Sequence, residues 1–308
     1  MIKLVIRIRN YIFKRFKYLN QLILFFTTRE LLAPRIWRKI QPMGELKLTL
    51  PNGNFINYYA MGNDQLARSI IWTQFKDWEY TTIQIFCDLS IIFKHFIDIG
   101  GYTGIYSIIY LCLNNKSEAL IFEPNPDMIT NIEKNLNTNN IQKRAKVFNI
   151  ALSNNVGKQI FAIKKDRTSS CLISNDEKSD SIEKIIEVQV TKFDELNYVL
   201  DAEIVKIDVE GYEIKILQGM NNFLKKNHPI LILECLYYDR FLELQSYLKG
   251  LGYRKIFNIL PNGLLDTEVK YFSLPGSANL LCIPDTKETL VRKITNRYQI
   301  YYNDYLIN

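Results

Sequence analysis

Residues 96–104 have the sequence FIDIGGYTG, an apolar run that leads through one acid into a cluster of glycines. The apolar part predicts a buried strand, and a helical pattern follows from Gly104 to Leu113. Glycines at a strand-to-helix turn let a ligand approach the backbone closely. The spacing is G-G-x-x-G rather than G-x-G-x-x-G, and Asp98 stands where a dinucleotide's pyrophosphate would lie, which disfavours an NAD-dependent oxidoreductase.

Strands and helices alternate along the chain on the C-terminal side of this turn. Further strands are expected at 119–122, 146–151, 203–209 and 229–235, with helices at 126–138, 212–226 and from the last strand to residue 251. Strands separated by helices of this size predict parallel β-α-β units. The tail differs, because residues 253–259 and 280–283 predict antiparallel edge strands.

The pattern divides the chain into four segments. We expect a basic helical extension at 1–40, a hairpin with two helices at 41–94, an α/β domain at 95–285 and a C-terminal helix at 286–308. Within the domain, residues 157–192 form an insertion, in which two alternating runs flank a stretch rich in Ser, Asp and Lys. Such a stretch is typical of a surface loop that acts as a lid.

The net charge of +7 is concentrated at the N-terminus. Residues 1–40 hold ten basic residues and one acid, whereas the other 268 residues hold 29 basic and 31 acidic residues. A near-neutral body argues against a nucleic-acid partner, which usually needs a basic surface on the folded domain.

An amphipathic pattern accompanies this N-terminal charge. On a helical wheel one face is apolar and basic residues lie opposite; the apolar positions are Val5, Ile8, Ile12, Phe16, Leu19, Ile23 and Phe26. A basic helix of this kind is typical of an anionic membrane surface, reached here through residues 1–30. The alternative is a helix that packs on its own domain or on a second copy of the chain in a homo-oligomer.

Cysteine usage bears on the compartment. The five cysteines are widely spaced and include no C-x-x-C pair, so neither a disulfide framework nor a zinc site is predicted. A reducing, cytoplasmic setting follows, with any membrane association peripheral and on the inner face.

Acidic residues stand at the ends of four predicted strands. Asp98 ends the first, Glu123 the second, Asp208 and Glu210 the fourth, and Glu234 the fifth. Because the carboxyl ends of parallel strands meet at one edge of a sheet, these five carboxylates should gather there. Such an edge suits a cationic ligand, and S-adenosylmethionine carries a sulfonium and an ammonium. Glu123 is placed to accept hydrogen bonds from both ribose hydroxyls.

Several motifs resemble the FkbM family of S-adenosylmethionine-dependent methyltransferases. The resemblance covers roughly residues 79–252 and rests on DIGGYTG at 98–104, FEPN at 122–125, NIALS at 149–153 and, above all, VKIDVEGYE at 205–213. It implies a class I methyltransferase (Rossmann-like) α/β fold, with a doubly wound, mostly parallel seven-stranded sheet. It also implies O-methylation of sugars or secondary metabolites. Members commonly carry Ala-Asn where this chain has Gly101-Tyr102, a departure at the methionine end of the cofactor.

The resemblance also assigns roles to residues. Those implied in cofactor binding are Asp98, Gly100, Gly101, Tyr102, Gly104, Glu123, Pro124, Asn149, Ala151 and Leu152. Those implied to face the transferred methyl and the acceptor are Asp208, Glu210 and Glu234. Acceptor contacts are expected from Ser169 and Ser170 in the lid and from Tyr237 and Tyr238 after the fifth strand, although these tyrosines also fit an ordinary helix start.

Methyl transfer to an alcohol near neutral pH needs a general base or a metal. The two histidines, His95 and His228, precede strands and should lie at the opposite end of the sheet. The expected base is therefore Asp208 or Glu210, or else these acids hold a divalent cation such as Mg²⁺.

Two other functions compete with this interpretation. A non-catalytic binding or assembly protein would have a cofactor site weakened by the tyrosine at position 102. A nucleic-acid amino-methyltransferase is disfavoured, because DVEG at 208–211 stands where such enzymes usually carry [ND]-P-P-[YFW].

Overall fold

The structure is a computed structural model in which one large sheet organises the chain. It describes residues 17–28, 40–62, 65–165, 170–173, 181–197, 200–236, 238–268, 277–289, 292 and 296–301. Within these residues the sheet has nine strands, which are, from edge to edge, β15 (Gln299–Tyr301), β13 (Gly263–Asp266), β12 (Lys255–Leu260), β14 (Ser277–Ile283), β11 (Ile230–Leu236), β10 (Ile204–Ile207), β3 (His95–Ile99), β4 (Glu118–Phe122) and β5 (Ala145–Phe148).

The direction of the strands confirms the predicted fold class. Strands β11, β10, β3, β4 and β5 are parallel to one another, and β14 lies antiparallel between β11 and β12. The seven strands from β5 to β12 form the doubly wound, mostly parallel sheet of a class I methyltransferase. Two further strands, β13 and β15, extend it beyond the expected seven.

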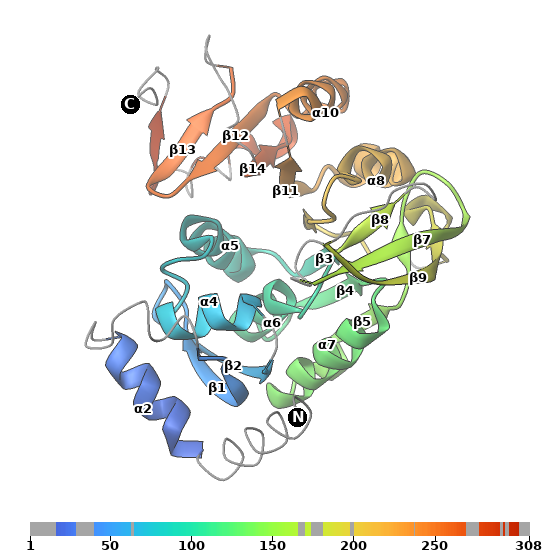
Figure 1. Cartoon of the computed structure of the whole chain (residues 1–308). Coiled ribbons are helices and arrows are strands. Elements are labelled where there is room, and N and C mark those ends of the chain that lie inside the picture. The colour runs from blue at the N-terminus through green and yellow to red at the C-terminus, as the bar shows by residue number, and fades with distance from the viewer. Residues whose placement is uncertain are drawn as a thin grey trace.

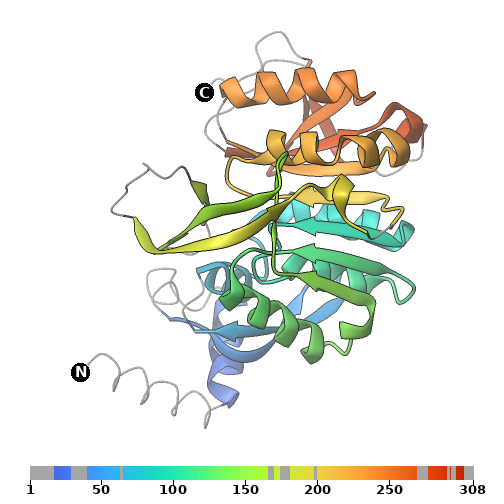
Figure 2. The ribbon, with the colours of Figure 1, turned by 90° about the vertical axis from the view of Figure 1, so that its right-hand side faces the viewer.

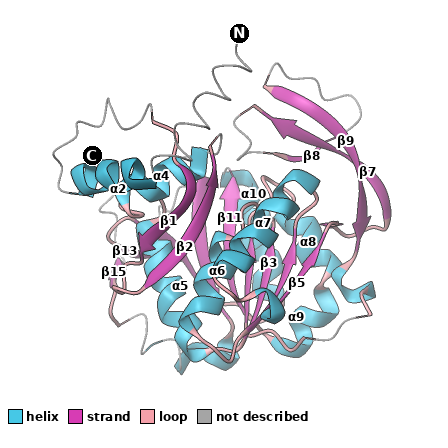
Figure 3. Ribbon diagram, turned by 90° about the horizontal axis from the view of Figure 1, so that it is seen from below, coloured by secondary structure: helices cyan, strands magenta, loops and turns pink. Residues whose placement is uncertain are grey.

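Helices cover both faces of the sheet, as Figures 1 and 3 show. One face carries α5 (Tyr80–Ile92), α6 (Ile105–Leu113) and α7 (Pro126–Thr138), together with α4 (Gln65–Thr73) and the hairpin of β1 (Met43–Thr49) and β2 (Phe55–Met61). The other face carries α8 (Glu213–Gly219), α9 (Asn221–Asn227) and α10 (Tyr238–Gly250). Side chains alternate between the two cores, since Phe96 belongs to the first and Ile97 to the second.

The N-terminal extension is described only as helix α2 (Lys17–Thr28). Ile23 and Leu24 are half-buried against the first core, whereas Leu22, Phe25 and Phe26 are exposed. Val5, Ile8, Ile12 and Phe16 lie outside the described residues. In the described part of the chain, no helix has the length and apolar character that crossing a membrane would require.

The insertion forms a small sheet of its own, in which the alternating runs at 158–163 and 185–191 are strands as predicted, and a third strand lies in the stretch predicted as a loop. Strands β7 (Gly157–Lys164), β8 (Cys171–Ile173) and β9 (Ile182–Thr191) pair with one another and with β6 (Ala151–Leu152), and Figure 2 shows them projecting from the body. β8 lies inside the polar stretch because Cys171, Leu172 and Ile173 are buried between neighbouring strands. The predicted strand at 146–151 is therefore two strands in two sheets.

The prediction of a C-terminal helix over residues 286–308 is wrong for residues 299–301. A short 3-10 turn covers Asp285–Lys287, but Gln299–Tyr301 form strand β15, which pairs in parallel with β13. The backbone N–H and C=O groups on the outer side of β13 pair with this strand, whereas a helix at the same place would leave them without partners. Residues 302–308 lie outside the described part.

Candidate active site

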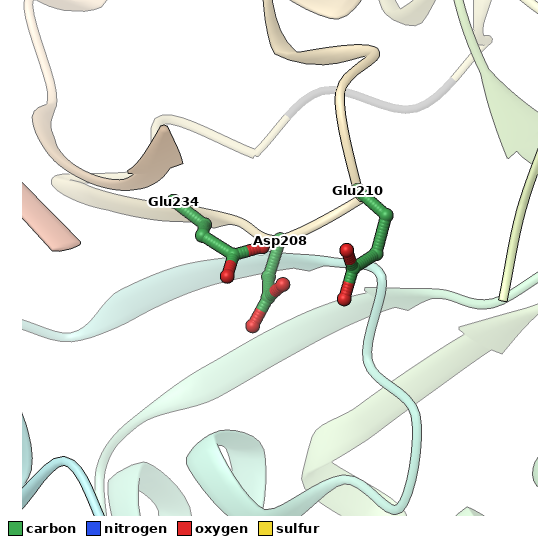
Figure 4. A group of neighbouring side chains, drawn as sticks. All are labelled: Asp208, Glu210 and Glu234. Carbon is green, nitrogen blue, oxygen red and sulfur yellow. The ribbon is translucent and has the colours of Figure 1, made fainter. Parts of the chain in front are cut away.

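A cavity opens at the carboxyl ends of β3, β4, β10 and β11. Asp98, Glu123, Asp208, Glu210 and Glu234 all line it, so the structure brings together the five acids that the sequence placed at strand ends. Figure 4 shows the last three of these side chains grouped where β10 and β11 end. Among the described residues of the lining, Lys206 is the only cation.

The glycine turn holds β3 close to the end of β10. Gly100 has φ +79°, and a Cβ built there would lie 1.8 Å from the backbone oxygen of Asp208. Only glycine fits this conformation and this approach. Gly101 is also tight, since its Cβ would lie 2.6 Å from Cγ2 of Ile121. Both glycines thus stand where a side chain would collide with the end of β10 or with β4.

Glu123 is a buried carboxylate held by the backbone. Its Oε2 accepts from the Tyr102 N–H at 2.9 Å and its Oε1 from the Asn125 N–H at 2.8 Å. Burial nevertheless raises the pKa of Glu123 to about 7, against the lowering effect of these hydrogen bonds. Tyr102 takes the left-handed conformation, with φ +48°, to make its contact.

Asp98 is also buried, on the α6 side of β3. Its Oδ2 accepts from the Ser107 hydroxyl at 2.6 Å. Burial raises the pKa of Asp98 to about 6, although Ser107 and Lys206 act in the opposite direction. Asp98 and Glu123, at the rim formed by the carboxyl ends of the strands, therefore both titrate close to neutrality.

Lys206 is a buried cation that the sequence reasoning did not select. It stands directly opposite Asp98 in the β10–β3 register, and its Nζ donates to Asp208 Oδ2 at 2.6 Å. The same Nζ lies 4.4 Å from the ring centroid of Tyr106. In the sequence it is a single lysine within the apolar strand VKI, and no periodic pattern marks it.

Lys206 and its neighbours set the charge states of the rim. Burial alone would lower the pKa of Lys206, but Asp208 and Glu79 raise it. Burial would raise the pKa of Asp208, yet the charge and hydrogen bond of Lys206 hold it below its usual value. Lys206 and Asp208 thus form an ion pair in which the lysine is buried and the aspartate side chain is 30% exposed.

Glu234 differs from Asp208 although the two are neighbours. Burial, with the charges of Asp208 and Glu210, raises the pKa of Glu234 to about 10, so it is protonated at neutral pH and shares a hydrogen bond with Asp208. One carboxylate oxygen from each of Asp208, Glu210 and Glu234 lies within 4.8 Å of the others. Glu210 reaches this position with φ +56°, an uncommon conformation that is concentrated at functional sites.

Several other predicted residues also lie at the cavity. Gly100, Gly101, Tyr102, Pro124, Ala151, Leu152 and Ser170 contribute to its lining. The insertion adds Phe161 and Leu172.

Three of the predicted residues do not line the cavity. Asn149 donates to the backbone oxygens of Glu123 and Pro124, each at 2.9 Å, and so braces the end of β4. Gly104 caps α6 and packs on Ile132. Tyr238 begins α10, where its ring stacks on Phe241. Ser169 and Tyr237 lie outside the described residues.

A comparison with protein families agrees with this geometry. A sequence model of the methyltransferase FkbM domain matches residues 98–255, just over half of the chain. The chain belongs to the FkbM methyltransferase family. Family membership implies S-adenosylmethionine as methyl donor. The acid-rich cavity, in which Lys206 is the one cation among the described lining residues, suits such a cationic ligand.

Solved structures with a similar fold are distant. A methyltransferase FkbM from Methylobacillus flagellatus KT is 14% identical with a TM-score of 0.43, and the match covers 61% of this chain and 43% of that one. A precorrin-6y C5,15-methyltransferase from Geobacter metallireducens GS-15 is 12% identical with a TM-score of 0.39, over 66% of this chain and 86% of the other. A ribosomal protein L11 methylase from Lactobacillus delbrueckii subsp. bulgaricus has the same identity and TM-score, over 66% and 78%. The curated proteins contain no match to the chain.

Residues that precede the matched region, 98–255, complete the wall of this cavity. Trp78 and Glu79 line it from the turn before α5, and the Tyr106 hydroxyl donates to Glu79 Oε2. Burial raises the pKa of Glu79, while Lys206 opposes the rise. No periodic or motif signal marks Trp78 and Glu79 in the sequence, because their role depends on where the turn meets the sheet.

Proposed function

We propose that the protein transfers the methyl group of S-adenosylmethionine to a hydroxyl oxygen of a sugar or glycan, with membrane-linked polysaccharide intermediates and secondary metabolites as acceptors to test. The observation that carries the proposal is this cavity, in which five strand-end acids and Glu79 surround Lys206, the one lysine among the described lining residues. Its negative potential favours a cationic donor and an uncharged acceptor.

The turn after β3 and the end of β4 would hold the donor. Glu123 would accept from the ribose hydroxyls through the lone pairs that its two backbone contacts leave free, and Ala151 and Leu152 would border the base. Bound S-adenosylmethionine supplies a methyl carbon that takes up the lone pair of the acceptor oxygen while its C–S bond breaks and that electron pair stays on sulfur.

Asp208 is the group proposed to receive the acceptor's proton. Lys206 keeps it ionised, so it is available as an acceptor at neutral pH. Glu234 is protonated and hydrogen-bonded to Asp208, so the two act as a unit. The protein's contribution is to orient the hydroxyl and to take its proton at Asp208 Oδ.

Mg²⁺ is the second way to activate the hydroxyl. Asp208, Glu210 and Glu234 would hold it through oxygen atoms, the donors that this ion prefers, and it would lower the pKa of a bound hydroxyl. Methyl transfer in the presence and absence of EDTA separates the two mechanisms: unchanged turnover supports the carboxylate base alone.

The first experiment is calorimetric binding of S-adenosylmethionine and S-adenosylhomocysteine to the wild type, Asp98→Ala and Glu123→Ala. Binding by the wild type that is lost in both variants supports the proposal. A folded wild type that binds neither compound would instead favour the non-catalytic binding or assembly protein.

For the N-terminal extension we propose contact with an anionic membrane surface, on the cytoplasmic side. Ten basic residues in the first forty and the exposed Leu22, Phe25 and Phe26 of α2 support this proposal. Sedimentation with anionic vesicles of the whole chain and of a chain lacking residues 1–40 tests it. Equal sedimentation of the two would contradict it.

A further inference from the structure

A second cavity lies beside the first along the same rim of the sheet. It is lined by the turn before α5 and the start of that helix (76–82), by the end of β12 and the following turn (258–262), and by the start of β14 (277–279). Because β14 runs antiparallel, its first residues meet the last residues of β11, as the pairing of Ser277 with Leu236 shows. The second cavity therefore opens at the carboxyl ends of β11 and β12.

The two cavities share three residues, Trp78, Glu79 and Glu234. These residues mark the boundary between them, and Glu234 shares a hydrogen bond with the proposed base Asp208. A molecule in the second cavity would thus extend past Glu234 toward Asp208 in the first cavity.

Two buried acceptor atoms without a hydrogen-bond partner stand at this boundary. They are Glu234 Oε2 and Asn279 Oδ1, on residues directly opposite each other in the β11–β14 register. Buried polar atoms are nearly always satisfied, so an unsatisfied pair on two residues that line a cavity indicates a ligand that donates hydrogen bonds. Hydroxyl groups are such donors.

The remaining walls are polar but mostly uncharged. Hydroxyl and amide side chains come from Thr81, Thr82, Asn262 and Ser277, with aromatic rings from Trp78 and Tyr80. Among the described lining residues, the carboxyl groups of Asp77, Glu79 and Glu234 outnumber the one basic side chain, Lys76, which opposes a phosphorylated ligand. Aromatic rings beside amide and hydroxyl groups are suited to a ligand that is apolar on its faces and polar on its edges, as a sugar ring is.

We infer that the second cavity binds the methyl acceptor and that this acceptor is an uncharged, hydroxyl-rich molecule of the sugar class, presented past Trp78 to Glu234 and Asp208. The inference rests on the proposed function. Residues 76–82, 258–262 and 277–279 all lie outside the region matched by the FkbM family. Donor binding therefore belongs to the family domain, and acceptor choice belongs to the segments that this chain adds on either side.

The test uses the full chain loaded with S-adenosylhomocysteine and a panel of methyl glycosides of glucose, galactose, mannose and rhamnose, followed by saturation-transfer NMR. The blocking variant is Ser277→Trp, and Asn279→Leu removes one unsatisfied acceptor atom. Ser246→Trp, at an exposed position of α10, is the matched control. Binding of S-adenosylhomocysteine by each variant, measured first by calorimetry, shows that the variant is folded.

The inference predicts glycoside binding in the wild type and in Ser246→Trp, weakened at least about tenfold in Ser277→Trp and about fivefold in Asn279→Leu, with S-adenosylhomocysteine affinity unchanged. Glucose 6-phosphate should bind about tenfold more weakly than methyl glucoside. Glycoside binding that survives in Ser277→Trp would overturn the assignment of the cavity. A loaded wild type that binds no glycoside, or that prefers the phosphate, would overturn the acceptor class, whereas failure to bind S-adenosylhomocysteine would overturn the proposed function itself.

Discussion

The two cavities along the sheet rim are built in opposite ways. The first takes its acids from the carboxyl ends of successive parallel strands, and backbone N–H groups and Lys206 set their charge. The second takes amides, hydroxyls and aromatic rings from a helix start, a turn and an antiparallel strand. Chemistry common to a family can thus reside in short local motifs, while specificity resides in the segments that happen to meet them.

The first cavity differs most from the second in its close backbone contact at Gly100, and the Gly100→Ala variant tests this contact. A Cβ at Gly100 would lie 1.8 Å from a backbone oxygen, with φ at +79°. We expect a loss of at least about 4 kcal/mol of stability and no S-adenosylhomocysteine binding. Gly53→Ala is the control, because Gly53 has φ +84° but nothing within 4 Å, so its cost is only about 1 kcal/mol. Equal unfolding midpoints in urea for the two variants would contradict the close approach.

Lys206→Met tests whether one cation holds the first cavity together. Removing it leaves the half-buried Asp208 and Glu79 without their cationic partner, and we expect a loss of about 2–3 kcal/mol at neutral pH. Lys206 lowers the pKa of Asp208 in the fold, so its stabilisation is present above the unfolded pKa of 3.8 and fades as the pH falls. The deficit of the variant should therefore shrink in acid. Lys158→Met, in an exposed pair with Glu187, should cost less than about 1 kcal/mol.

Glu123 should make both the stability of the protein and the ligand affinity of the first cavity depend on pH. Its folded pKa of about 7 lies above 4.5, so its contribution to stability is greatest below pH 4.5 and declines as the pH rises toward 7. Ligand affinity should change in the opposite sense, because the ionised form accepts the ribose hydroxyls better. We expect S-adenosylhomocysteine to bind about tenfold more tightly at about pH 8 than at about pH 5.5. Calorimetry of Glu123→Gln should show a smaller slope, with the remainder due to Asp98, and Glu118→Gln, at the exposed start of the same strand, should retain the full slope.

The wall of the second cavity is tied by one side-chain hydrogen bond. The Thr81 hydroxyl donates to the Pro261 backbone oxygen at 2.5 Å and so joins α5 to the turn after β12. Thr81→Val should cost about 1 kcal/mol of stability and raise the acceptor KM while donor affinity stays constant. Thr130→Val, on the exposed face of α7, is the matched control. A change in donor affinity alone would place Thr81 with the first cavity instead.

The smallest effect is expected far from both cavities, on α2. Phe25 is 46% exposed there, and Phe25→Ser should weaken sedimentation with anionic vesicles about threefold without altering donor binding. Ile91→Ser, at an exposed position of α5, provides the comparison. Vesicle binding that Phe25→Ser leaves intact would favour a helix that serves only to pack on the domain.

Much of the first cavity was predictable because its determinants are local. Asp98 and Glu123 follow apolar strands, and parallel strands necessarily end at one edge. Lys206 was missed because a charged residue in a strand has no periodic signature; its burial depends on β3 and β10 lying side by side. The strand at Gln299–Tyr301 was missed for a similar reason, since only the open edge of β13 makes it a strand.

The sequence by itself determined the alternation of strands and helices, the glycine turn and the acids of the rim, because periodicity and turn chemistry act over a few residues. The tertiary structure alone decided which carboxyl groups are ionised, since desolvation depends on the elements packed above them. It also decided the second cavity, whose walls are separated by about two hundred residues of sequence from Trp78 to Asn279. Those walls meet only because α5 begins beside the end of the sheet at which β12 ends and β14 starts.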